Sequence, residues 1–97
     1  MQRDPHWIDG KPAMPANGQW LDVFDPATRA VASQVADGDA RDVDAAVQAA
    51  QAAFPEWSSL PNSARARWME RLADALEARN DEFARAEALD GGKPLAL

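Results

Sequence analysis

The stretch DARDVDAAVQAAQAAF, residues 39–54, decides how this 97-residue chain folds. Its apolar residues recur at intervals of three or four, as on one side of an α-helix, at Val43, Val47, Ala50 and Phe54. Asp39 suits the N-cap position, and Asp42 places negative charge in the first turn, where the helix dipole favours it. The pattern predicts a helix from about residue 40 to 53. We expect Pro55 to end it, because a residue before proline is disfavoured in the α region.

Two more helices are predicted after a loop over residues 56–61. Asn62 or Ser63 can cap the first of them, and a third, shorter helix is expected to begin near Asn80. Gly91 suits the left-handed position that closes a helix. The apolar stripe of the middle helix consists of Trp68, Met69, Leu72, Ala73 and Leu76.

Upstream of residue 39 the chain is divided by turn pairs such as Asn17-Gly18 and Asp25-Pro26. Strands are predicted near residues 19–24 and 30–36, joined by the turn at 25–28, with a short edge strand at Trp7-Ile8. The expected fold class is α/β, an N-terminal β-hairpin followed by three α-helices, with residues 1–38 in strands and turns and 39–97 helical. Since two strands do not form a stable sheet alone, the chain is expected to belong to a larger domain.

Composition excludes several classes of partner. The formal net charge is −6, and ten Lys and Arg are scattered among sixteen Asp and Glu, so no basic stripe for nucleic acid is present. No run approaches the roughly 18 apolar residues that span a bilayer, so no membrane partner is expected. A polar N-terminus without an apolar signal segment favours a cytoplasmic location. With no cysteine, the chain offers no thiolate nucleophile.

Few residues are candidates for chemistry. His6 is the single histidine and has no motif partner, so we expect a solvated side chain. The glycines lack the spacing of phosphate-binding loops, and the four tryptophans are expected to be core residues. Three interpretations stay open at this point: a piece of an enzyme, a stand-alone helical interaction module, or a truncated inactive gene product.

Six segments, taken in order, resemble the N-terminal region of the aldehyde dehydrogenase superfamily, and together they extend over nearly the whole chain. Arg29 stands where that family usually has Gly, and Gly91 where a polar residue is common, which affects local turn geometry alone. The segments are WIDGK (7–11), VFDPAT (23–28), VADGDARDVDAAV (35–47), AAF to Trp57 (52–57), RLADALEARNDE (71–82) and EALDGGKP (87–94).

The resemblance implies an NAD(P)-dependent enzyme that oxidises a small-molecule aldehyde to a carboxylic acid. In that family a cysteine thiolate forms a thiohemiacetal, hydride passes to NAD or NADP, and a glutamate-activated water releases the acid. Those catalytic and cofactor-binding residues would lie beyond residue 97, so none is assigned to this chain. Residues 1–97 would form the N-terminal part of the Rossmann-like cofactor-binding domain, in a homo-oligomer that is a dimer or tetramer.

One ligand role is implied within the chain. Some members of the family bind a monovalent cation through backbone carbonyls and an aspartate that correspond here to Val23, Phe24 and Asp90. Oxygen ligands of this kind suit a hard alkali cation. The alternative is that Asp90 stabilises the Gly91-Gly92 loop by hydrogen bonds. Residues 92–97 resemble members that act on muconic-type semialdehydes and residues 79–82 resemble betaine-aldehyde members, so the aldehyde is left open.

Overall fold

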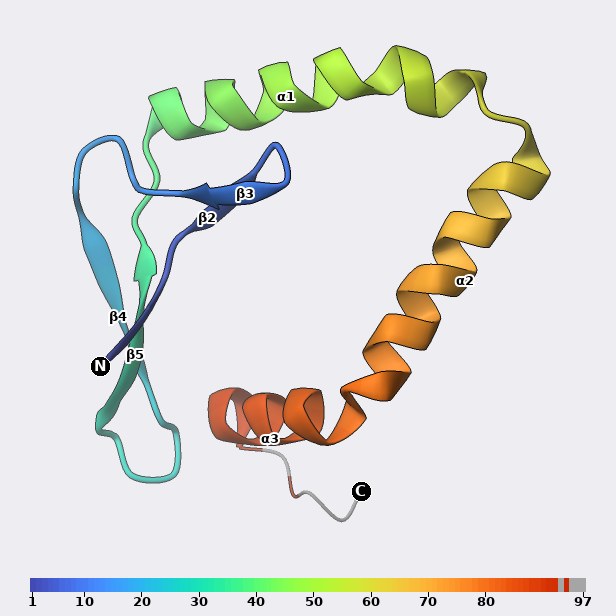
Figure 1. The fold of residues 1–97 in the computed structure, drawn as a ribbon. Coiled ribbons are helices and arrows are strands. Elements are labelled where there is room, and N and C mark those ends of the chain that lie inside the picture. The colour runs from blue at the N-terminus through green and yellow to red at the C-terminus, as the bar shows by residue number, and fades with distance from the viewer. Residues whose placement is uncertain (93, 95–97) are drawn as a thin grey trace.

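The computed structural model describes residues 1–92 and Pro94. Figure 1 shows a flat, open ring in which the strands occupy one side, α1 and α2 form the top and the other side, and α3 returns towards the strands. The principal extents are 48 × 38 × 15 Å. The elements are β1 (Gln2–Asp4), β2 (His6–Ile8), β3 (Lys11–Ala13), β4 (Trp20–Phe24), β5 (Val31–Ala36), α1 (Ala40–Ser59), α2 (Asn62–Ala78) and α3 (Asn80–Gly91).

The strands form two separate sheets. The predicted hairpin is confirmed as the antiparallel pair β4–β5, and the expected edge strand is β2, which pairs with β3. The sequence reading missed β1, which lies parallel to β5 and completes a three-stranded sheet of order β1-β5-β4. Its residues, Gln-Arg-Asp, carry no apolar signal, so only the pairing with a distant strand reveals it.

The turn between β4 and β5 is fixed by local hydrogen bonds. The Asp25 carboxylate accepts from Ala27 N at 2.9 Å, and Arg29 N donates to Asp25 O at 2.7 Å. Arg29 has φ 63°, in the left-handed region that glycine adopts freely. The glycine that the resemblance leads one to expect here would adopt this backbone freely, and Arg29 bears some backbone strain.

Helix α1 begins as predicted and ends later. Asp39 is the N-cap, and its side chain accepts from Arg41 N at 2.9 Å. The prediction that Pro55 ends the helix is wrong, because α1 continues through it to Ser59. The stop comes at Leu60, which is extended (φ −66°, ψ 141°) and directly precedes Pro61. A proline inside a helix removes one hydrogen bond, and here that loss did not end the helix.

The caps of the later helices also differ from expectation. Neither Asn62 nor Ser63 is the N-cap of α2: Pro61 precedes the helix and Asn62 is its first residue, with its side-chain oxygen accepting from the Arg65 guanidinium. Helix α3 begins at Asn80 as predicted. Gly91 is still helical, and the left-handed closing residue is Gly92, with φ 74° and its N–H on Ala88 O at 2.9 Å.

The described part of the chain has no apolar core. Only Pro15 and Asp42 are buried there, and the expectation that the tryptophans are core residues is not met within the chain: Trp7 is 71% exposed and Trp68 is 50% exposed. The radius of gyration is 16.9 Å, against about 13 Å for a compact domain of this length. The accessible surface is 7757 Å², against about 5,400 Å² for a folded monomer of this mass. The helix stripes therefore lie open.

Within the described residues, no helix has both the length and the apolar character needed to cross a membrane.

Candidate functional site

A pocket of about 230 Å³ lies between the three-stranded sheet and the end of α3. Val23 and Phe24 line it from β4, and Asp90 lines it from the last turn of α3. The structure thus brings together the three residues that the family resemblance singled out, although they are separated by more than sixty positions in sequence. The pocket is also lined by Gln2, Asp4, Ala32, Ser33, Ala86 and Leu89.

An irregularity in the β4–β5 ladder lies at this pocket. Val23 is opposite Ser33, but Phe24 is opposite Val31, so Ala32 is left without a partner on β4. A bulge of this kind disrupts the regular pairing of backbone groups and redirects the strand. Carbonyl oxygens beside such an irregularity are chemically suited to a hard cation.

The left-handed Gly92 helps to place α3 against the β4–β5 turn. A Cβ atom built on Gly92 would lie 3.3 Å from Cγ of Pro26, which is tighter than ordinary van der Waals contact. A side chain at this position would therefore force Pro26 to shift slightly. The close approach holds the end of α3, and with it Asp90, beside the strand ends.

Asp4 is a second carboxylate on the pocket that sequence reasoning missed. It accepts a hydrogen bond from Gln2 Nε2 at 2.8 Å. No sequence signal could have found it, because its position depends on the parallel pairing of β1 with β5. Among residues 1–92 and 94, no three His, Asp or Glu side chains gather as a transition-metal site would require.

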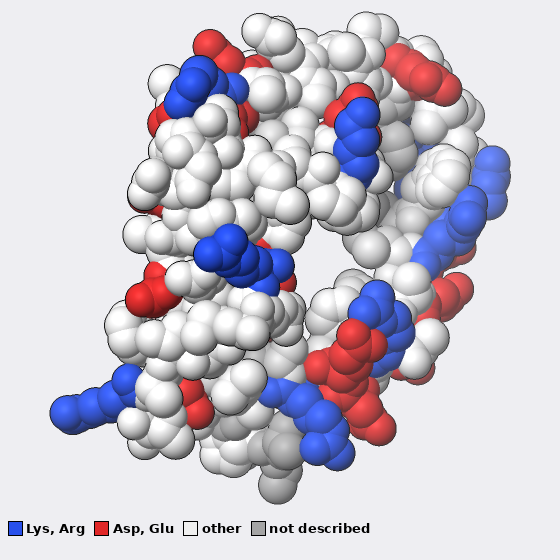
Figure 2. Space-filling model, turned by 60° about the vertical axis from the view of Figure 1, so that its left-hand side comes forward, with Lys and Arg blue, Asp and Glu red and all other residues white. Residues whose placement is uncertain are grey.

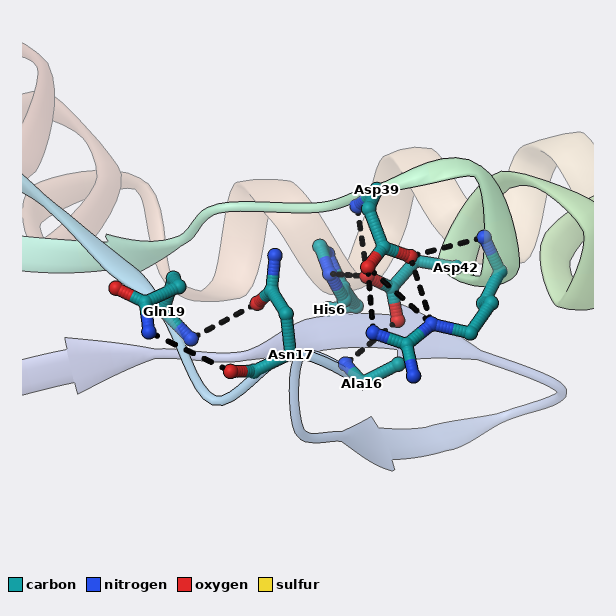
Figure 3. A network of polar contacts seen from close by, with 7 residues as sticks. His6, Ala16, Asn17, Gln19, Asp39 and Asp42 are labelled. Atoms are coloured by element: carbon teal, nitrogen blue, oxygen red, sulfur yellow. Dashed lines mark hydrogen bonds and ion pairs between the residues drawn. The ribbon is translucent and has the colours of Figure 1, made fainter.

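A second polar cluster lies at the start of α1 (Figure 3). The Asp42 carboxylate accepts from Asp39 N at 3.0 Å, which completes a capping box, and from Ala16 N at 3.0 Å. Its Oδ2 lies 3.5 Å from Nε2 of His6. The prediction of a solvated His6 is wrong: its side chain is 23% exposed, and its Nε2 is buried without a hydrogen-bond partner. The ring is held because β2 packs beside α1.

The carboxylates of this cluster favour their charged forms. The backbone N–H of Asp39 lowers the pKa of the Asp42 carboxyl, with a further contribution from the N–H of Ala16. The Arg41 guanidinium, 2.7 Å from Asp39 Oδ2, lowers the pKa of Asp39. Attraction to the helix dipole is thus only part of the role of Asp42, which also ties the loop at Ala16 to the helix.

The surface charge is mixed, without a large basic field on the face that Figure 2 shows. Lys and Arg side chains there alternate with Asp and Glu along the helical side, and the same view shows an opening through the ring. This face offers no continuous basic groove for a phosphate backbone.

Comparison with known proteins gives a consistent result. Residues 13–97 match the family model described as "Aldehyde dehydrogenase family". The chain is 38% identical to lactaldehyde dehydrogenase of Escherichia coli (strain K12), over 92% of this chain and 19% of that protein. It is 42% identical to human 2-aminomuconic semialdehyde dehydrogenase, over 95% of this chain and 18% of that protein.

Solved structures share the arrangement. The crystal structure of PnpE in complex with nicotinamide adenine dinucleotide superposes with a TM-score of 0.92 at 38% identity, covering 98% of this chain and 19% of that one. The expected α/β fold is confirmed. The chain spans about a fifth of the length of these proteins.

Proposed function

Since the chain belongs to the aldehyde dehydrogenase family, we propose that it is the N-terminal structural segment of an NAD(P)-dependent aldehyde dehydrogenase. The observation that carries the proposal is the absence of an apolar core in the described residues, combined with an arrangement that matches a fifth of much longer enzymes. Apolar helix faces that are 50% or more exposed, such as those at Trp68 and Leu72, need covering protein. The remainder of the enzyme would supply it.

The chemistry of the whole enzyme would come from other segments. The chain has no cysteine, so the thiolate that attacks the aldehyde would lie elsewhere, as would the residues that hold NAD or NADP. These 97 residues would form part of the Rossmann-like cofactor-binding domain and support its strands and helices. We also propose a homo-oligomeric, cytoplasmic enzyme whose aldehyde is undetermined, since the relatives named above act on different aldehydes.

Activity measurements on two samples test this proposal. The whole polypeptide that carries residues 1–97 should form NADH or NADPH when an aldehyde is added, and the 97-residue chain alone should form none above a blank without protein. Activity of the short chain alone would overturn the structural role. If the whole polypeptide had no reactive cysteine, the proposal that it is an aldehyde dehydrogenase would be wrong.

The alternative of a stand-alone interaction module predicts different physical behaviour. A module should unfold in one sharp thermal transition and bind little hydrophobic dye. A segment with open helix faces should bind the dye strongly and self-associate. The exposure of Phe54 (64%) and Met69 (58%) favours the segment.

We further propose that the pocket beside α3 binds a monovalent cation through the backbone oxygens of Val23 and Phe24 and the carboxylate of Asp90. The placement of Val23, Phe24 and Asp90 on one pocket supports it. In the whole enzyme, Asp90→Asn should remove a stabilising effect of K⁺ or Na⁺ on the thermal midpoint, whereas Asp74→Asn on α2 should keep it. The same response to the cation in both variants would leave Asp90 with only a loop-stabilising role.

A further inference from the structure

The β2–β3 hairpin is weakly integrated into the fold. Each strand has three residues, and in the part of the chain that the structure describes they pair only with each other. A two-stranded hairpin of this length is marginal by itself. Trp7, in the middle of β2, is 71% exposed within these 97 residues, so its ring adds little packing between the hairpin and the rest of this chain.

The tip of the hairpin lies over α1 without filling the space between them. A groove of about 470 Å³ separates residues 7–10 from the alanines at positions 46, 49, 50 and 53 of α1. Alanine side chains are too short to interlock with the hairpin, so the contact along this groove is loose. Within these residues, the polar contacts between the hairpin and α1 lie at the hairpin's base.

The base is held by one carboxylate. Asp42 accepts from Ala16 N, just after β3, and faces His6, the first residue of β2. Pro15 and Asp42 are the two buried residues among those described, so this contact is the most buried point of that part of the chain. Gly38 packs directly against the His6 ring, since a Cβ at this position would lie 3.0 Å from Cε1 of His6.

We propose that the β2–β3 hairpin is a flap, fastened to α1 at Asp42 and able to open over the groove when that contact is lost. The two ends of the hairpin's base reach this contact, one through the His6 ring at the start of β2 and the other through the Ala16 N–H in the loop that follows β3 (Figure 3). Loss of the carboxylate removes both attachments together. The β1-β5-β4 sheet shares no backbone pairing with the hairpin and stays closed when the flap opens.

Hydrogen–deuterium exchange read by mass spectrometry tests the flap in the whole polypeptide that carries this chain. In Asp42→Asn, peptides from residues 6–13 should exchange roughly tenfold faster, because a charged acceptor is replaced by a neutral one. Peptides from β4 and β5 should keep their wild-type rates. The matched control is Asp44→Asn, two residues along α1, which should leave the hairpin unchanged.

Gly38→Ala provides an independent route if Asp42→Asn does not fold. The added methyl displaces the His6 ring and should also speed exchange of the hairpin. Equal hairpin exchange in Asp42→Asn and Asp44→Asn would overturn the flap, as would an equal rise in β4–β5, which would indicate general loosening. These readouts do not depend on enzyme activity, so they are independent of the function proposed above.

Discussion

Replacing Leu72 by Asp should have opposite effects in the short chain and in the whole polypeptide. Leu72 lies on the apolar stripe of α2 and is 53% exposed in the structure. In the 97-residue chain alone, the substitution removes an open apolar side chain, so dye binding and self-association should fall. In the whole polypeptide the same position should be covered, and a carboxylate there should prevent folding.

The size of the second effect follows from the exposure. Covering a fully exposed leucine contributes about 1.5–3 kcal/mol, so covering the remaining half contributes about 1 kcal/mol. An unpaired carboxylate in the same place adds a desolvation cost of several kcal/mol. A total above about 3 kcal/mol lowers the ratio of folded to unfolded protein more than about a hundredfold.

The assay compares soluble yield and urea unfolding of the whole polypeptide carrying Leu72→Asp or Arg67→Asp. Arg67 lies on the same helix, away from the stripe, and controls for added negative charge. We expect Arg67→Asp to remain soluble and Leu72→Asp to be lost. A near-normal yield of Leu72→Asp would show that the stripe is not covered and would refute the reasoning.

Three further predictions concern stability of the whole polypeptide in urea. Because the pKa of Asp42 is lowered, its charged form stabilises the folded state fully above the ordinary pKa of 3.8, and this stabilisation disappears as the pH falls through the lowered pKa. The free energy of unfolding of Asp42→Asn should therefore fall less steeply at acid pH than that of the wild type. Gly18→Ala should lower the free energy of unfolding by about 1 kcal/mol because its backbone is left-handed, and Gly92→Ala should lower it more because the added methyl group also meets Pro26. Equal losses in the two variants would show that the contact with Pro26 does not matter for stability. Arg29→Gly should stabilise by about 0.5 kcal/mol by relieving φ 63°, and a destabilised variant would contradict the strain.

Sequence patterns were reliable where the deciding interactions are local. The hairpin of β4 and β5, the N-cap at Asp39 and the start of α3 at Asn80 all depend on neighbours within a few residues. The predicted end of α1 was wrong because two local preferences compete there, the helix-breaking effect of proline and the helix propensity of its neighbours. Pro55 is tolerated inside α1 because the surrounding residues favour a helix strongly enough, and Pro61 ends it instead.

The candidate site was visible only in part. Val23, Phe24 and Asp90 were found through family resemblance and not through their spacing, and the structure gathers them at one pocket. Asp4 could not be foreseen, because a polar three-residue strand shows no periodic pattern. Its place on the pocket follows from a parallel pairing across about thirty residues.

The sequence alone determined the order of β4, β5 and the three helices, the two apolar helix stripes and the lack of a cysteine nucleophile, since periodicity and composition need no partner. Tertiary structure decided which side chains meet: His6 with Asp42, Ala16 with the start of α1, and Asp90 with the end of β4. The physical reason is that contacts between distant segments depend on how the helices are oriented in space. That orientation is a property of the whole packing and is absent from any local window of residues.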